Sequence, residues 1–112
     1  MEPDQSPRRT PDGHFVLIKG RKWRATDPAV PEEIAARLRR HLMAARRAVR
    51  SATSAADANA ERAARARVHQ AKIALGERGA PWWDQTPDER RRRWEQGLAR
   101  LDDGARDDET QD

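Results

Sequence analysis

The sequence contains no cysteine and no tyrosine, and it has a single phenylalanine. Without cysteine, disulfide bonds, thiolate nucleophiles and cysteine-containing zinc sites are all excluded. Only 14 of the 112 residues are Val, Ile, Leu or Phe, and they are accompanied by four Trp and two Met. So few large apolar side chains exclude an extensive hydrophobic core.

Long apolar runs are also absent. The longest, Phe15 to Ile18, is far shorter than the roughly 20 residues that a membrane-spanning helix requires. The first twelve residues are polar, contain three prolines and lack the apolar segment of a secretory signal peptide. We therefore expect a soluble cytoplasmic protein with no membrane partner.

Arginine and alanine dominate the composition, with 20 residues each, whereas lysine occurs only three times. The codons of a GC-rich genome favour both abundant residues and would produce this bias without any function. Alternatively, arginine is used because its planar guanidinium binds phosphate or carboxylate through two hydrogen bonds. The sequence leaves both interpretations open.

The charge is unevenly distributed along the chain. Residues 1–12 carry a net charge of −1, residues 13–101 carry +10 and residues 102–112 carry −5, which together give the net charge of +4. A basic body followed by an acidic end is typical of proteins with interaction tails, although a solubilising terminus has the same composition. An acidic tail of this kind is expected to compete with other anions for the basic surface.

Residues 14–25 predict a short β-hairpin. His14 to Ile18 is an apolar run that favours a strand, Lys19-Gly20 forms a two-residue turn, and the chain returns through Arg21 to Ala25. This turn places Val16 opposite Trp23. An isolated hairpin is barely stable in water, so we expect this one to pack against the rest of the protein.

Three helices are predicted after the hairpin, over residues 31–52, 56–77 and 87–103, from the helical spacing of apolar residues and from capping signals. Small residues line the facing sides of the first two helices, which predicts a closely packed antiparallel pair. The fold class is therefore mainly α with a short N-terminal β-hairpin, a long antiparallel helical hairpin and a third C-terminal helix. We expect residues 1–12 to be a disordered arm, residues 13–101 a single domain and residues 104–112 an acidic disordered tail.

The ionisable residues show no catalytic or metal-binding pattern. His41 lies on the apolar side of the first predicted helix, while His69 points away from the inner side of the second, so the two imidazoles should not converge on a metal. Near the third helix, Glu89 is explained by a capping box with Thr86. With no catalytic triad, no phosphate-binding loop and no zinc spacing, we expect no enzymatic activity, no cofactor, no metal and no small-molecule substrate.

Arginines on the outer faces of the first two helices are the strongest functional signal. A basic ridge of this kind could follow a phosphate backbone, and its binding would depend strongly on salt. A solvated helix face has the same pattern. The candidate polyanion-binding residues are Arg39, Arg40, Arg46, Arg47, Arg50, Arg62 and Arg65, with Lys72 on the same outer face of the second helix.

The four tryptophans supply nearly all of the aromatic area, and most of them are expected to fill space between the hairpin and the alanine-lined helices. Adjacent side chains point in different directions, so Trp82 and Trp83 cannot both be fully buried with ease. We therefore consider one of Trp82 and Trp83 as an exposed contact to a partner protein or a platform for base stacking.

Several short blocks of this sequence resemble a family of small, uncharacterised bacterial proteins that is sometimes labelled "biopolymer transporter Tol". The similarity covers roughly residues 11–98, and the block Pro81-Trp82-Trp83 after Gly76-Glu77-Arg78-Gly79 is its most specific part. The resemblance implies no activity, cofactor or catalytic residue. The other blocks are residues 11–18, 20–24, 26–29, 71–72 and 75.

Two functional hypotheses follow from the sequence. The first is a small non-enzymatic binding domain whose arginine ridge binds a polyanion, most simply nucleic acid without base specificity, or an acidic protein. The second is a protein-interaction or self-associating module that uses Trp82 or Trp83 and the alanine-rich helices. A homodimer is compatible with the thin core.

Overall fold

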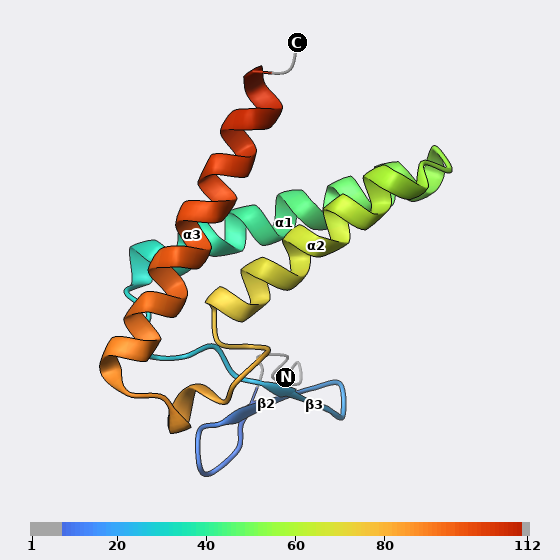
Figure 1. The fold of residues 1–112 in the computed structure, drawn as a ribbon. Coiled ribbons are helices and arrows are strands. Elements are labelled where there is room, and N and C mark those ends of the chain that lie inside the picture. Colours follow the sequence, from blue (N-terminus) through green and yellow to red (C-terminus); the bar gives the residue numbers. More distant parts are fainter. Residues whose placement is uncertain (1–7, 111–112) are drawn as a thin grey trace.

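The computed structural model in Figure 1 describes the backbone of residues 8–110 and the side chains of residues 8–105. It confirms a mainly helical fold with a small antiparallel sheet at the N-terminal end and a third, C-terminal helix. The elements are β1 (Arg8–Arg9), β2 (Phe15–Ile18), β3 (Arg21–Arg24), α1 (Glu32–Ser54), α2 (Ala58–Ala74), the 3₁₀ turn η1 (Trp82–Asp84) and α3 (Pro87–Thr110).

The sheet is built on the predicted hairpin. β2 pairs with β3 in the expected register, with Val16 opposite Trp23. Lys19 and Gly20 both have positive φ angles, of 50° and 79°, which is the backbone conformation of a two-residue type I′ turn. Val16 and Trp23 therefore project from the same face of the sheet, and that face is turned toward the helices, because both residues line a groove with Arg46 of α1 and Lys72 of α2.

Part of the expected disordered arm is instead ordered, and this corrects the prediction for residues 8–12. Arg8 and Arg9 form β1, which pairs with β2 and makes the sheet three-stranded. The chain is folded back by a turn in which the Thr10 hydroxyl and the His14 backbone N–H both donate to the Asp12 carboxylate, at 2.6 and 3.0 Å. Residues 1–7 lie outside the part of the chain that the structure describes.

Helices α1 and α2 form an antiparallel helical hairpin whose turn end projects from the rest of the molecule (Figure 1). Its interface consists largely of alanine, with leucine at the open end, where α3 crosses. Leu38 and Leu75 are fully buried there, and Trp94 and Leu98 of α3 pack on them. Most of the buried large apolar side chains therefore belong to one cluster around the crossing of the three helices.

Helix α3 begins with the predicted capping box. The Thr86 backbone N–H donates to Glu89 at 2.8 Å, and the Glu89 backbone N–H donates to the Thr86 hydroxyl at 3.2 Å. The helix then continues to Thr110, so the prediction of a disordered tail is wrong for residues 104–110. Gly104 does not end the helix. Glycines that end a helix usually have a positive φ, and Gly104 is not among the residues with positive φ. Residues 111–112 lie outside the described residues.

Gly97 lets α3 approach α2 closely. A Cβ atom at this position would lie 2.6 Å from the Cβ of Ala74, a separation at which the two helices must move apart. We expect Gly97→Ala to lower the free energy of unfolding by about 1–2 kcal/mol, because overpacking outweighs the gain of about 1 kcal/mol in helix propensity. Urea denaturation measures the change.

Gly104 provides the matched control on the same helix. Among the described residues, no heavy atom other than those of its chain neighbours and its own helix backbone lies within 4 Å of a Cβ added there, so Gly104→Ala should raise the free energy of unfolding by about 0.5–1 kcal/mol. Equal shifts of the urea midpoint in the same direction for the two variants would contradict the close approach at Gly97.

Candidate functional site

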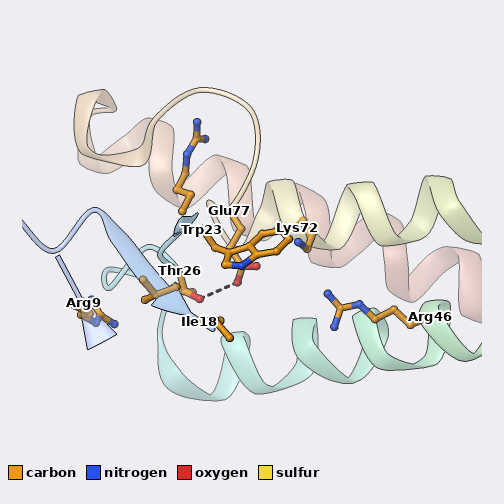
Figure 2. A pocket seen from close by; sticks show the side chains of 9 residues that line it. Arg9, Ile18, Trp23, Thr26, Arg46, Lys72 and Glu77 are labelled. Atoms are coloured by element: carbon orange, nitrogen blue, oxygen red, sulfur yellow. Dashed lines mark hydrogen bonds between the residues drawn. The ribbon is translucent and has the colours of Figure 1, made fainter. Parts of the chain in front are cut away.

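An open groove of about 470 Å³ lies between the sheet and the helical hairpin. The inward face of the sheet forms one wall, and side chains from α1 and α2 form the other (Figure 2). Its volume is within the range of small-molecule sites, roughly 300–1,000 Å³. The groove is lined by Arg9, Val16, Ile18, Trp23, Arg24, Thr26, Arg46, Lys72 and Glu77.

Trp23 is the aromatic side chain of this groove and remains 40 % exposed. The hairpin register turns it toward the helices, where the ammonium of Lys72 lies 5.4 Å from the ring centroid. The guanidinium of Arg21, also on β3, lies 4.7 Å from the same ring. Two cations therefore flank an accessible indole, an arrangement that suits cation–π contacts and leaves the cations available to anions.

Lys72 extends from α2 into the groove and is buried, which corrects the prediction that it belongs to the outer face of the helix. Burial lowers the pKa of Lys72, the nearby cations Arg78 and Arg46 lower it further, and only Glu77 acts in the opposite direction. The protein around Lys72 is thus a less favourable environment for the positive charge than water is. A bound anion would stabilise that charge, since an opposite charge at close range favours the ionised form.

Glu77 is the one carboxylate among the residues that line the groove, and it is already hydrogen-bonded. The Thr26 hydroxyl donates to Glu77 Oε2 at 2.9 Å (Figure 2). Arg9, Arg46 and Lys72 reach the same space from β1, α1 and α2. Three cations from three separate elements therefore face a single carboxylate, and the groove has an excess of positive charge.

A buried ion-pair cluster holds the segments that shape the groove. Asp27 is 1 % exposed and follows directly after Thr26. Its carboxylate accepts from Arg93 Nη2 at 2.5 Å and from the Ala29 backbone N–H at 2.8 Å, and Arg90 Nη1 lies 3.6 Å away. The side chains of α3 thereby fix the connection between β3 and α1, which positions Thr26 at the edge of the groove.

Two further hydrogen bonds attach the sheet to the segment between α2 and α3. The Arg24 guanidinium donates to the Gly79 carbonyl at 2.6 Å, so this arginine is engaged with the protein rather than free for a ligand. The Trp82 indole N–H donates to the Ala25 carbonyl at 3.0 Å. The sheet is therefore anchored at the end of β3, and its separation from the helices is set by these contacts.

The seven predicted arginines are all exposed, but the structure does not bring them into one site. Only Arg46 lines the groove. At about 100° per residue, Arg39 and Arg50 project from the same side of α1 as Arg46, and Arg65 from the same side of α2 as Lys72. The consecutive positions Arg40 and Arg47 point about 100° away from them, and Arg62 also points away from the direction of Lys72.

Some of these arginines are paired and others are not. Arg39 forms an ion pair with Glu32 at 3.3 Å, Arg65 forms one with Glu61 at 3.1 Å, and Arg62 donates to Asn59. Among the described residues, no carboxylate lies within ion-pair distance of the remaining predicted members, which are Arg40, Arg46, Arg47 and Arg50. Of the seven predicted arginines, those without an ion pair among the described residues, apart from Arg62, therefore all lie on α1.

Of Trp82 and Trp83, which the sequence suggested as alternative exposed contacts, only Trp83 keeps partial exposure. Trp82 is buried at 6 % exposure, and its indole N–H donates a hydrogen bond to the Ala25 carbonyl. Trp83 is half-buried, and its ring stacks on His14 with 3.9 Å between the centroids and packs edge-on against Phe15. Both rings join the sheet to the segment before α3. The exposed tryptophan of the chain is Trp23 instead.

His41 and His69 each contact a charged side chain. His41 Nε2 lies 2.7 Å from Asp102 Oδ1, and Arg37 donates to the other oxygen of this carboxylate at 2.5 Å. His69 lies 3.3 Å from an Arg78 nitrogen. Within the described part of the chain, no group of three or more His, Asp or Glu residues could hold a metal ion.

The acidic end of α3 does not lie over the groove. Asp102 contacts α1 through Arg37 and His41, on the side of the helix roughly opposite Arg39 and Arg46. From there α3 carries the chain away from the helical hairpin (Figure 1). This arrangement does not support the expected competition between the tail and the basic surface within one molecule.

No family model, curated protein or solved structure matches this chain. In the part of the chain that the structure describes, none of the helices combines the length and the apolar character needed to cross a bilayer.

Proposed function

We propose that this protein is a small, non-catalytic, cytoplasmic domain that binds a polyanion, most simply nucleic acid, without base specificity. The basic side of α1 and α2 that continues into the groove forms the binding surface. Arg46 and Lys72 lie in the groove, and Arg39, Arg50 and Arg65 extend the positive charge along the helices.

The observation that carries this proposal is the convergence of Arg9, Arg46 and Lys72 on a groove that contains an exposed tryptophan. A basic helix face that is merely solvated would not bring three cations together. It would also not bury a lysine at a position where burial lowers its pKa. Positive grooves lined by aromatic rings are typical of proteins that follow a nucleic-acid backbone. The carboxylate that lines the groove, Glu77, accepts a hydrogen bond from the Thr26 hydroxyl.

The proposal predicts that binding depends on the arginines on the groove side of α1 and not on those that point elsewhere. We expect the triple variant Arg39→Gln, Arg46→Gln and Arg50→Gln to weaken binding to a fluorescently labelled random duplex. The slope of log affinity against log salt should fall by about 2–3, since each phosphate contact contributes about 0.9. Glutamine keeps the helix propensity of arginine, so α1 should remain folded. Fluorescence anisotropy across a salt series measures both quantities.

The matched control removes the same charge from the other side. Arg40→Gln, Arg47→Gln and Arg62→Gln alter three exposed arginines that do not line the groove. This variant should keep a salt slope close to that of the unmodified protein. Equal losses in the two triple variants would show that only net charge matters, and the absence of binding to any polyanion at low salt would overturn the proposed function.

A second candidate is a protein-interaction or self-associating module. It is favoured by the exposure of Ile18, Trp23 and Met43, at 41, 40 and 50 %, around and beside the cations of the groove. Such a surface fits an acidic partner protein or a second copy of this chain. Concentration-dependent sedimentation that the groove-side triple variant leaves unchanged would favour this candidate over a polyanion.

A further inference from the structure

We propose that the groove takes one unpaired nucleotide of a single-stranded nucleic acid, with its base stacked on Trp23 and its phosphate between Lys72 and Arg46. This inference rests on the proposed function and specifies its partner. In this proposal, Trp23 on the sheet distinguishes single strands from duplexes by stacking on the base, and the helices contribute only positive charge for the phosphates.

The position of Trp23 carries the stacking part of the inference. Large aromatic side chains in a small domain with few apolar residues are usually needed for the core, and Trp82 and Trp94 are used in this way. Trp23 is left 40 % exposed beside Val16 and Ile18, which give the groove an apolar wall. Every nucleobase has a flat π-face, so stacking on this indole tolerates any sequence.

Arg21 covers part of this ring in the free protein, with its guanidinium 4.7 Å from the centroid. The side chain is exposed and forms no ion pair among the described residues, so a base can displace it at small cost. The displaced guanidinium then becomes available to a phosphate. Arginine planes also stack on bases, which gives Arg21 a place on the outer side of the base.

The phosphate position follows from the cations around the indole. Lys72 Nζ lies 5.4 Å from the Trp23 ring centroid, and Arg46 is close enough to act on the charge of Lys72. Trp23, Lys72 and Arg46 line the same groove (Figure 2), so the sugar-linked phosphate of a nucleotide stacked on Trp23 is placed near both cations. From there the strand can continue along α1 past Arg39 or Arg50.

The dimensions of the groove favour a single strand over a duplex. A volume of about 470 Å³ accommodates one nucleotide and not a double helix. In a duplex, each base is covered on both faces by its neighbours, and only its edges are accessible in the grooves. Only an unpaired base can present its face to Trp23.

The test compares three labelled oligonucleotides with the same strand length, about twelve nucleotides, which is within the usual size of single-strand sites. They are an oligothymidylate, an abasic strand with the same backbone, and a random duplex. The full chain should bind the oligothymidylate about five- to a hundredfold more tightly than the abasic strand. Trp23→Leu should abolish this preference, while Trp23→Phe should retain part of it.

Leu17→Ala is the control for loss of an exposed apolar side chain on the same hairpin. Leu17 is 44 % exposed and does not line the groove, so its replacement should leave all three affinities unchanged. Equal affinity of the unmodified protein for the oligothymidylate and the abasic strand would overturn stacking while leaving polyanion binding intact. This comparison needs no variant, so it remains decisive even if Trp23→Leu unfolds. Binding to none of the three at low salt would instead overturn the proposed function.

Discussion

Replacing Asp27 by asparagine is expected to lower the free energy of unfolding by about 3–5 kcal/mol. The Asp27 carboxylate is buried and lies between Arg93 and Arg90, and the Arg93 side chain is itself only 7 % exposed. Asparagine has the same size, but it removes the negative charge and leaves a buried guanidinium without its counterion. In either orientation, the amide NH₂ also faces a donor, because Arg93 and the Ala29 N–H approach opposite oxygens.

The same substitution at the exposed pair of Asp88 and Arg91 is the matched control. These groups are 3.9 Å apart with side chains 79 and 61 % exposed, so Asp88→Asn should cost about 1 kcal/mol or less. Urea denaturation followed by circular dichroism measures both variants. If Asp27→Asn were no more destabilising than Asp88→Asn, Asp27 would not be the residue that holds α3 to the connection between β3 and α1.

Replacing Gly76 by alanine is expected to have the second largest effect, a loss of about 2–5 kcal/mol. Gly76 ends α2 with a φ of +85°, a conformation that disfavours alanine by about 1–2 kcal/mol. The added Cβ would also lie 2.9 Å from the Cβ of Asp27 and 3.1 Å from Trp82 Cδ1. Both neighbours are buried, so overpacking adds about 1–3 kcal/mol.

A substitution at Gly79 distinguishes the cost of the backbone conformation from the cost of overpacking. The φ of Gly79, +81°, is nearly the same, but the nearest atom to an added Cβ is Ile73 Cγ1 at 3.8 Å, an ordinary contact. Gly79→Ala should therefore lose only the conformational part, about 1–2 kcal/mol. Thermal unfolding of the two variants gives the difference. Equal losses would mean that Asp27 and Trp82 can move to accommodate the methyl group.

Local signals in the sequence were sufficient for most of the secondary structure. The Lys19-Gly20 turn specified the hairpin register, and the Thr86 capping box specified the start of α3, because both depend on residues a few positions apart. The strand β1 was missed although Thr10-Pro11-Asp12-Gly13 is a strong turn signal, which the polar composition of the arm obscured. The predicted third helix ends at residue 103, before Gly104, because glycine usually marks a helix end, whereas α3 continues to Thr110.

The candidate site was only partly predictable. Exposed arginines could be placed on helix faces from their spacing, and Arg46 proved to be one of the groove residues. Arg9, Trp23 and Lys72 could not be assigned to a common site, because they come from β1, β3 and α2 and meet only when the sheet docks on the helices. The sequence suggested Trp82 and Trp83 as contacts, but hydrogen bonding and ring stacking hold them against the sheet.

By itself, the sequence determined the helical hairpin, the β-hairpin with its turn, the capping box of α3, and the excess of positive charge on the body of the protein. These properties follow from local backbone preferences and from composition. The tertiary structure decided which charges act together. The ion pairs of Asp27 with Arg90 and Arg93 span more than sixty residues, and they fix how the sheet faces α1 and α2. That docking buries Lys72, leaves Trp23 accessible and directs three cations into one groove, since contacts between distant segments depend on packing that no local pattern records.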